Sequence, residues 1–159
     1  MNLVLDAIRR LLDESGVPFR EVHHSPTFTS EESAKARGED LRTGGKALLL
    51  KTDDVFRLFV VPADRKLDST AVKRHLAAKK TRFATADELK DLTGLVPGSV
   101  PPFGSPILPF ELFVDEAIQA NERIAFNGGS LTDSIILATA DYLAVAKPVV
   151  FAFSVAPGA

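Results

Sequence analysis

The sequence contains no cysteine among its 159 residues, and this absence excludes several kinds of chemistry. A chain without cysteine has no disulfide framework, no thiolate metal site and no cysteine nucleophile. No apolar run reaches the roughly 18 residues needed to span a bilayer, and the N-terminal segment mixes Asp6 and Arg9 with its apolar residues. We therefore expect a cytoplasmic protein with no membrane partner.

The chain also lacks a strong excess of charge of either sign, since 19 Lys and Arg against 21 Asp and Glu give a net charge of −2. This balance excludes a protein that coats nucleic acid through bulk charge, and we expect no DNA partner. Repeats, linkers and low-complexity tracts are missing as well. With 45% apolar residues the sequence predicts one domain over residues 1–159.

Several catalytic and metal-binding motifs are absent. The segment Gly44-Gly45-Lys46 does not have the spacing of a Walker motif, and the three histidines follow no metal-binding spacing. Ser99 and Ser130 stand outside any Gly-x-Ser-x-Gly pattern, so neither is predicted to be a triad nucleophile. We expect neither a metal nor a cofactor.

Apolar periodicity, capping residues and glycines predict the helices. Thr29 with Glu32 and Thr85 with Glu88 have the form of capping boxes. Helices are expected over residues 2–15, 29–37, 68–78, 85–93 and 139–145. Strands are expected over residues 19–22, 46–52, 55–61, 81–83, 110–115, 123–126, 133–137 and 149–154, with a hairpin turn at 53–54. This order predicts an α/β (α+β) fold with a mixed, curved sheet and helices packed outside it.

Three segments are candidates for chemistry. Lys46 begins an apolar strand after two glycines, which suits capture of a phosphate or carboxylate; the alternative is an edge lysine that ends a strand in solvent. The segment 98–104, Gly-Ser-Val-Pro-Pro-Phe-Gly, is stiffened by two prolines. It can form one wall of a ligand site with Phe103 as a stacking ring, or it is a structural turn with a buried Phe.

The third segment is 127–130, Asn-Gly-Gly-Ser, whose backbone N–H groups could stabilise an oxyanion; the alternative is an ordinary hairpin loop. A cluster of basic residues is either a solvated face or a contact for an RNA backbone. It comprises Lys66, Lys73, Arg74, Lys79, Lys80 and Arg82.

An ordered series of short motifs resembles one known family. The series is Lys46 at a strand start, Val60-Val61-Pro62 with Leu67-Asp68, Glu88-Leu89 with Thr93-Gly94, the segment 98–104, Val114-Asp115 and Gly128-Gly129. In this order the motifs resemble the YbaK/prolyl-tRNA-synthetase-associated domain family, whose members are aminoacyl-tRNA deacylases or editing inserts of the synthetase. Other relatives carry a basic or His-containing sequence at the late glycine loop, whereas this chain has Asn127-Gly128-Gly129-Ser130 there. The identity of the amino acid that the protein accepts is therefore open.

The resemblance implies a barrel-like mixed sheet and a cleft for the 3′ end of a mischarged tRNA. Lys46 matches the functional lysine of the family. The expected substrate-binding residues are His24, Thr29, Gly98, Ser99, Pro101, Pro102, Phe103, Gly104, Asn127, Gly128, Gly129 and Ser130. The expected activity is hydrolysis of a small amino acid such as Cys or Ala from tRNA-Pro, with prolyl-tRNA synthetase as a further partner.

An aminoacyl ester is already activated, so positioning and modest charge stabilisation suffice for its hydrolysis. In the expected mechanism Lys46 anchors the terminal adenosine or the ester carbonyl, and Gly128 or Gly129 steadies the oxyanion. Water, a ribose hydroxyl acting as base, or the thiol of a cysteinyl substrate remain open as the attacking group. The alternatives are a non-catalytic RNA-binding or regulatory module with the same fold, and a small-molecule esterase or amidase that uses the same cleft.

Overall fold

The computed structural model describes residues 1–157, which contain five α-helices and ten β-strands. The helices are α1 (Leu3–Glu14), α2 (Ser30–Arg37), α3 (Ser69–Leu76), α4 (Ala86–Thr93) and α5 (Thr139–Ala146). The strands are β1 (Arg20–His23), β2 (Gly45–Thr52), β3 (Val55–Pro62), β4 (Lys66–Leu67), β5 (Thr81–Phe83), β6 (Leu112–Asp115), β7 (Arg123–Asn127), β8 (Asp133–Ala138), β9 (Val149–Phe151) and β10 (Ser154–Val155).

The strands divide among three sheets. A five-stranded sheet has the order β5-β2-β3-β6-β9, with antiparallel pairs around β2 and parallel pairs on both sides of β6. An antiparallel sheet has the order β1-β8-β7, and β4 pairs with β10. The predicted mixed α/β fold is confirmed, but the sheet is not a closed barrel, because the strands split into separate sheets that meet at a bridge between Gly44 and Ala125.

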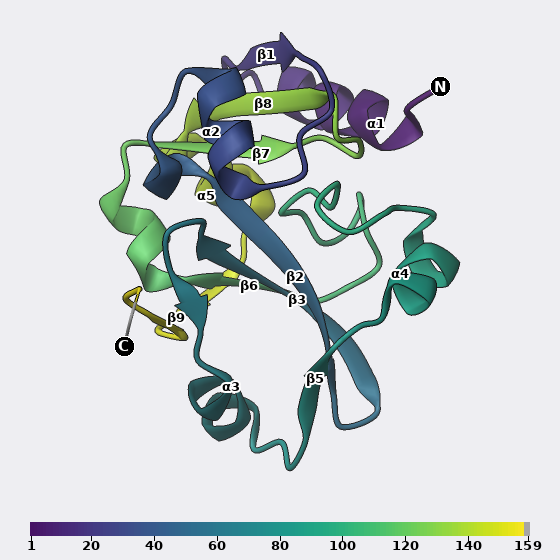
Figure 1. The fold of residues 1–159 in the computed structure, drawn as a ribbon, viewed down its shortest axis with the longest axis vertical. Helices are drawn as coiled ribbons and strands as arrows, with labels where there is room; N and C mark the ends of the chain where they lie inside the picture. Colours follow the sequence, from purple (N-terminus) through teal and green to yellow (C-terminus); the bar gives the residue numbers. More distant parts are fainter. Residues whose placement is uncertain (158–159) are drawn as a thin grey trace.

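Figure 1 shows how these parts lie in space. The three-stranded sheet, with α1 and α2, occupies one end of the molecule, and α3 and β5 lie at the other. The long β2–β3 hairpin runs between the two ends, with its turn at Asp53-Asp54 as predicted. Strand β2 therefore carries Lys46 close to α2 and Lys51 close to β5.

Local signals in the sequence fix the helix ends. Thr29 and Thr85 accept hydrogen bonds from the backbone N–H groups three residues later, and α4 has the full capping box. Gly38 and Gly94 end α2 and α4 with φ values of 70° and 75°, a left-handed conformation that glycine adopts at little cost. These predicted boundaries are confirmed.

Several elements differ from the prediction: β6 begins at Leu112 and not at residue 110, and β4 was not predicted. Helix α3 ends at Leu76 because Ala77 adopts a left-handed conformation with φ of 53°. The predicted strand 149–154 divides into β9 and β10, which belong to different sheets. Between them the buried Phe153 donates its backbone N–H to Asp115 Oδ1 at 2.7 Å, so the chain leaves one sheet to join the other.

The core consists of two clusters of buried apolar side chains. The larger cluster joins α1, β7, β8 and α5 to the segment 98–104, and the smaller one lies under α3 around Phe59 and Phe153. Among the described residues there is no helix with the length and apolar character needed to cross a membrane. The larger cluster supports the surface that contains the candidate site.

Candidate functional site

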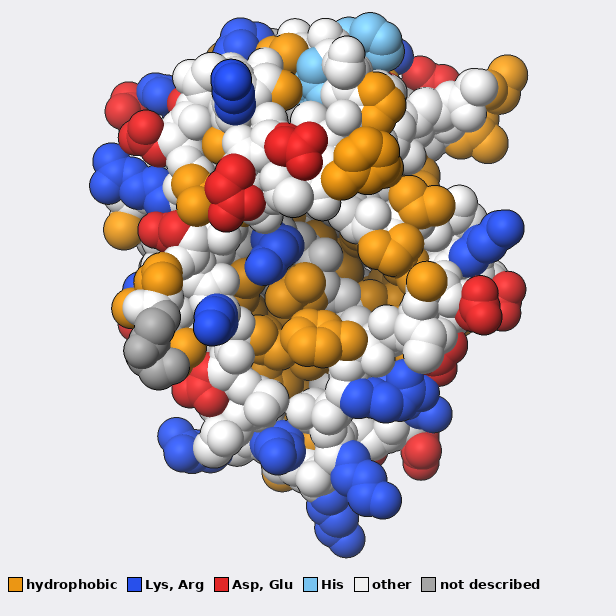
Figure 2. Space-filling view, in the orientation of Figure 1, with side chains coloured by type: hydrophobic (Ala, Val, Ile, Leu, Met, Phe, Trp, Pro, Cys, Tyr) orange, Lys and Arg blue, Asp and Glu red, His pale blue; other side chains and the backbone are white. Residues whose placement is uncertain are grey.

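A cavity of about 280 Å³ opens where α2, the start of β2 and the segment 97–100 come together. Its lining residues are Thr27, Phe28, Thr29, Ser30, Ser33, Arg37, Gly44, Gly45, Lys46, Ala47, Leu48, Ala63, Pro97, Gly98, Val100, Asn127 and Leu131. Figure 2 shows this face of the molecule hollowed below α2, with apolar side chains in the floor and Lys or Arg side chains at the edge. The cavity thus combines an apolar floor with cationic groups.

Lys46 lies at the mouth of the cavity as the second residue of β2, with an exposed side chain. Gly45 lets β2 approach β7 closely, because a Cβ at this position would lie 2.6 Å from Ile124 Cδ1. The predicted residues Thr29, Gly98 and Asn127 line the same cavity. Four predicted residues from widely separated segments of the sequence therefore meet at one site. They are Thr29, Lys46, Gly98 and Asn127.

Apart from Val100, which also lines the cavity, the rest of the segment 98–104 lies behind the cavity wall. Phe103 is only 1% exposed and packs edge-on against Phe126 and Tyr142, with ring centroids 5.5 and 5.4 Å apart. Pro101, Pro102, Ser99 and Gly104 are buried as well. Phe103 is thus a core residue with no face free for stacking on a base, and the alternative interpretation as a structural turn with a buried Phe holds.

The late glycine loop also lies outside the cavity lining. Gly128 donates its N–H to Asp133 O at 2.9 Å, and Gly129 donates its N–H to Ser99 O at 3.0 Å. Ser130 Oγ donates to Asp133 Oδ2 at 2.7 Å. The two N–H groups considered for an oxyanion hole are already engaged, so the loop is a hairpin that supports the wall through Ser99.

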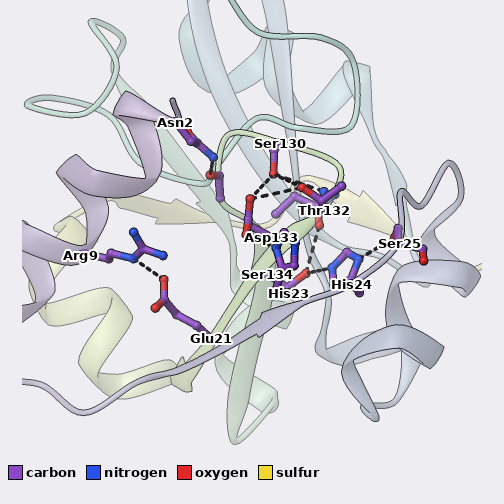
Figure 3. A network of polar contacts seen from close by, with 12 residues as sticks. Asn2, Arg9, Glu21, His23, His24, Ser25, Ser130, Thr132, Asp133 and Ser134 are labelled. Carbon is purple, nitrogen blue, oxygen red and sulfur yellow. Dashed lines mark hydrogen bonds and ion pairs between the residues drawn. The ribbon is translucent and has the colours of Figure 1, made fainter.

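His24 lies behind the site and takes part in a polar network. Figure 3 shows its ring directed at Ser134, and the distance from His24 Nε2 to Ser134 Oγ is 2.9 Å. The other ring nitrogen is 2.9 Å from Ser25 O. His24 does not line the cavity; it contacts Ser134, whose hydroxyl accepts a hydrogen bond from the lining residue Arg37.

Arg37 is a lining residue that the sequence analysis did not select. The residue is 8% exposed and donates from Nε to Ser134 Oγ at 2.9 Å and from Nη2 to Asn127 Oδ1 at 3.0 Å. Asn127 in turn donates from Nδ2 to Gly98 O at 2.7 Å. This chain of hydrogen bonds connects α2 with β7, β8 and the wall at Gly98.

Burial lowers the pKa of Arg37 to about 10, while the carboxylate of Glu39 acts to raise it. The guanidinium therefore remains charged at neutral pH. A signal for its burial exists in the sequence, since Ser33, Ala34 and Arg37 fall at helical spacing and the first two are small. These three residues form the buried face of α2.

Residues 24–145 match the protein family described as the aminoacyl-tRNA editing domain. The chain belongs to this family. The resemblance to the YbaK-like editing domains is therefore confirmed, and the chain is an editing hydrolase of the aminoacyl-tRNA deacylase class.

Similar proteins agree with this assignment. The multifunctional Ser/Thr-tRNA deacylase ProXp-y of Escherichia coli K12 is 35% identical over 144 residues, which cover 87% of this chain and 85% of that protein. The prolyl-tRNA editing protein ProX of Acetoanaerobium sticklandii is 25% identical over 146 residues, covering 89% of each chain. The proline–tRNA ligase of Shouchella clausii is 35% identical over 97 residues, which are 61% of this chain and 17% of the ligase.

A solved structure has the same fold. The crystal structure of a protein described as a candidate trans-editing enzyme for prolyl-tRNA synthetase superposes with a TM-score of 0.84. The superposition covers 98% of this chain and 99% of the other, at 24% sequence identity. The arrangement of helices and sheets around the cavity is therefore that of a known editing-domain fold.

Proposed function

We propose that this protein hydrolyses the ester bond of tRNA wrongly charged with a small amino acid, and that Lys46 is the residue on which this activity depends most. The observation that carries the proposal is that Lys46, an exposed cationic residue, is among the residues that line a cavity of about 280 Å³. A cavity of this size admits a small acyl group, while the terminal adenosine remains at the mouth.

Lys46 provides a mobile positive charge with three N–H donors. At the mouth of the cavity it can bind the ribose or phosphate of the terminal adenosine, or stabilise the ester oxygen as negative charge develops. The ester needs no protein nucleophile, since water can attack an acyl group that is held in place. The fixed wall at Gly98 and Asn127 supplies that positioning.

The size of the cavity supports small amino acids as substrates. Alanine and cysteine on tRNA-Pro are the substrates expected from the family, and serine and threonine join them because the Escherichia coli relative is named for those two. Binding in an apolar pocket separates side chains that differ by one methylene by only about 1–3 kcal/mol. Exclusion by size therefore sets the upper limit on the side chain of the amino acid that the cavity accepts, and hydrolysis of tRNAs charged with different amino acids measures that limit.

A second surface supports contact with the tRNA backbone. Basic residues gather around the turn of the β2–β3 hairpin, at the end of β2 away from Lys46. They are Lys51, Lys73, Lys79, Lys80 and Arg82, with Asp53 and Asp54 among them. Asp53 accepts the backbone N–H groups of Lys79 and Lys80 at 3.0 Å each, which holds the lysine loop against the hairpin.

The test is hydrolysis of a panel of tRNAs charged with alanine, serine, threonine, cysteine and proline. We expect the small, wrongly attached amino acids to be released faster than in buffer, and we expect Lys46→Ala to remove most of this acceleration. Lys90 is an exposed lysine on α4 that belongs neither to the cavity nor to the basic surface at the β2–β3 turn, so Lys90→Ala is the matched control and should keep wild-type rates. Esters that decay as in buffer, together with tight salt-sensitive tRNA binding, would instead identify a non-catalytic RNA-binding module.

A further inference from the structure

The guanidinium of Arg37 is held in one orientation inside the cavity. Two of its three nitrogens are used within the protein, Nε by Ser134 and Nη2 by Asn127. The Asn127 amide cannot turn over, because Asn127 Nδ2 donates to Gly98 O and a turned amide would place N–H donors against the guanidinium. The side chain is 8% exposed, so surrounding atoms also restrict it.

The third nitrogen, Nη1, has no hydrogen-bond partner among residues 1–157. Within residues 1–157, the side-chain nitrogen and oxygen atoms that are fully buried and also lack a hydrogen-bond partner are Asp64 Oδ1 and Thr139 Oγ1. Arg37 Nη1 is not one of them, so it keeps some contact with solvent. Nη1 lies 3.5 Å from the place that a Cβ on Gly44 would occupy, and Gly44 lines the cavity two residues before Lys46. Nη1 is therefore an oriented N–H donor that lies beside Gly44, next to the start of β2, on a residue that lines the cavity.

Three of the four lining hydroxyl groups on this wall, those of Thr27, Thr29 and Ser33, are satisfied within the protein, whereas the Ser30 hydroxyl has no hydrogen-bond partner among residues 1–157. Thr27 Oγ1 and Ser33 Oγ lie 2.8 Å apart and bond to each other. Thr29 Oγ1 accepts the N–H of Glu32 at 3.1 Å and donates to its carboxylate at 3.2 Å. Among the polar side chains of this wall, Arg37 Nη1 is the charged donor that the fold leaves for a ligand.

A guanidinium can only donate hydrogen bonds, so its ligand must present an acceptor. The hydroxyl oxygen of a serine or threonine side chain is such an acceptor, the sulfur of cysteine is a weak one, and the methyl of alanine is none. A site built to hydrogen-bond a hydroxyl discriminates strongly against the analogue that lacks it, because the buried donor is then left unpaired.

We propose that Arg37 is a specificity-determining residue whose Nη1 donates to the side-chain hydroxyl of the acyl group, so that the protein selects hydroxylic amino acids. The inference rests on the proposed function, since it requires the acyl group to enter this cavity. It assigns a role to a buried arginine that neither the sequence motifs nor the proposed role of Lys46 uses.

The decisive comparison uses acyl groups of nearly equal size on the same tRNA. Threonine is compared with 2-aminobutyrate, which replaces the hydroxyl by hydrogen, and serine is compared with alanine. For each ester the quantity is kcat/KM divided by the rate of hydrolysis in buffer, which corrects for intrinsic lability. We expect the hydroxylic member of each pair to be favoured by at least about tenfold.

Variants at Arg37 show whether this residue causes the preference. Arg37→Met keeps the length and removes the donors, and it should bring the ratio of kcat/KM between the hydroxylic and the non-hydroxylic member of each pair to about one. Ser134→Ala leaves the guanidinium in place but removes the partner of Nε, and we expect a smaller preference than in the wild type. Lys46→Ala should slow both members of each pair alike.

The outcomes separate the two proposals. If the wild type accelerates none of the esters, the proposed function fails. If it accelerates all of them with no advantage for the hydroxyl, or if a folded Arg37→Met protein keeps the advantage, the role of Arg37 is overturned and the proposed function stands. If Arg37→Met does not fold, the wild-type pairs and Ser134→Ala still decide the question.

Discussion

The cavity has two walls that differ in how they are built. The wall at 97–104 is continuous with the core, and its Phe103 lies between two other aromatic rings. The opposite wall, formed by residues 27–37, contains the exposed Phe28, several hydroxyl groups and the buried Arg37. Packing therefore holds the first wall, whereas hydrogen bonds and charge hold the second, and the two are joined through Asn127.

This difference indicates a division of labour. An apolar wall packed against the core resists movement and gives the cavity a fixed size, because protein interiors are close-packed and deform little. A polar wall can distinguish ligands by their hydrogen-bonding groups. The predictions that follow perturb one wall at a time.

The largest effect on stability is expected at Phe103. Phe103→Ala should lower the free energy of unfolding by about 3–5 kcal/mol, because a fully buried aromatic side chain leaves a cavity in the core. Phe28→Ala is the control on the other wall, where the side chain is 77% exposed, and it should change stability by no more than about 0.5 kcal/mol. Urea denaturation measures both, and equal losses would contradict the difference between the walls.

Lys46 stands between the walls and should affect activity without affecting stability. We expect Lys46→Ala to reduce deacylation by at least about 100-fold, in the range found when one electrostatic donor is removed from an active site. Its melting temperature should stay close to that of the wild type, since the side chain is exposed. Single-turnover hydrolysis and thermal melts report the two quantities, and a stable variant with full activity would remove Lys46 from the mechanism.

Asn127 joins the walls, so its loss should affect both stability and selectivity. Asn127→Leu leaves Arg37 Nη2 and Gly98 O without partners, at a cost of about 1–3 kcal/mol in the free energy of unfolding. We also expect the upper size limit of the substrate to rise, because the wall at Gly98 is no longer tied to Arg37. Hydrolysis of esters of increasing side-chain size measures this limit, and an unchanged limit would show that packing alone fixes the wall.

The smallest effect concerns the acid sensitivity of Glu39, which follows α2 and lies next to the polar wall. Hydrogen bonds from Arg123 hold the pKa of Glu39 below its ordinary value, with Arg20 contributing as well. A carboxylate with a lowered pKa adds stability that is fully present above the ordinary glutamate pKa of about 4.3 and is lost as pH falls through the lowered value. The stability difference between wild type and Glu39→Gln should therefore shrink below about pH 4. A difference that does not change with pH would contradict this account.

Sequence reasoning succeeded where the signals are local. The caps at Thr29 and Thr85, the glycines at 38 and 94 and the Asp53-Asp54 turn were predicted correctly, because each depends on a few neighbouring residues. The mixed sheet followed from the order of these elements. The division of the strands among three sheets could not be read from local patterns, because it depends on long-range pairing such as that of β4 with β10.

The site was predicted only in part, because it too depends on contacts between residues that are far apart in the sequence. Lys46, Thr29, Gly98 and Asn127 meet at the cavity, whereas Phe103 and the N–H groups of Gly128 and Gly129 are used by the core and the hairpin. Arg37 resembles an ordinary basic residue in the last turn of a helix. Its partners Asn127 and Ser134 lie 90 and 97 residues away in the sequence, so only the folded chain reveals the network.

The most direct measurement is a crystal structure with an amide-linked seryl analogue of 3′-amino-3′-deoxyadenosine, which mimics the charged 3′ end and cannot be hydrolysed. We expect the seryl group inside the cavity, Lys46 Nζ within hydrogen-bonding distance of a ligand oxygen, and the adenosine at the mouth. A ligand bound elsewhere on the surface, with Lys46 directed into solvent and the cavity empty, would contradict the account.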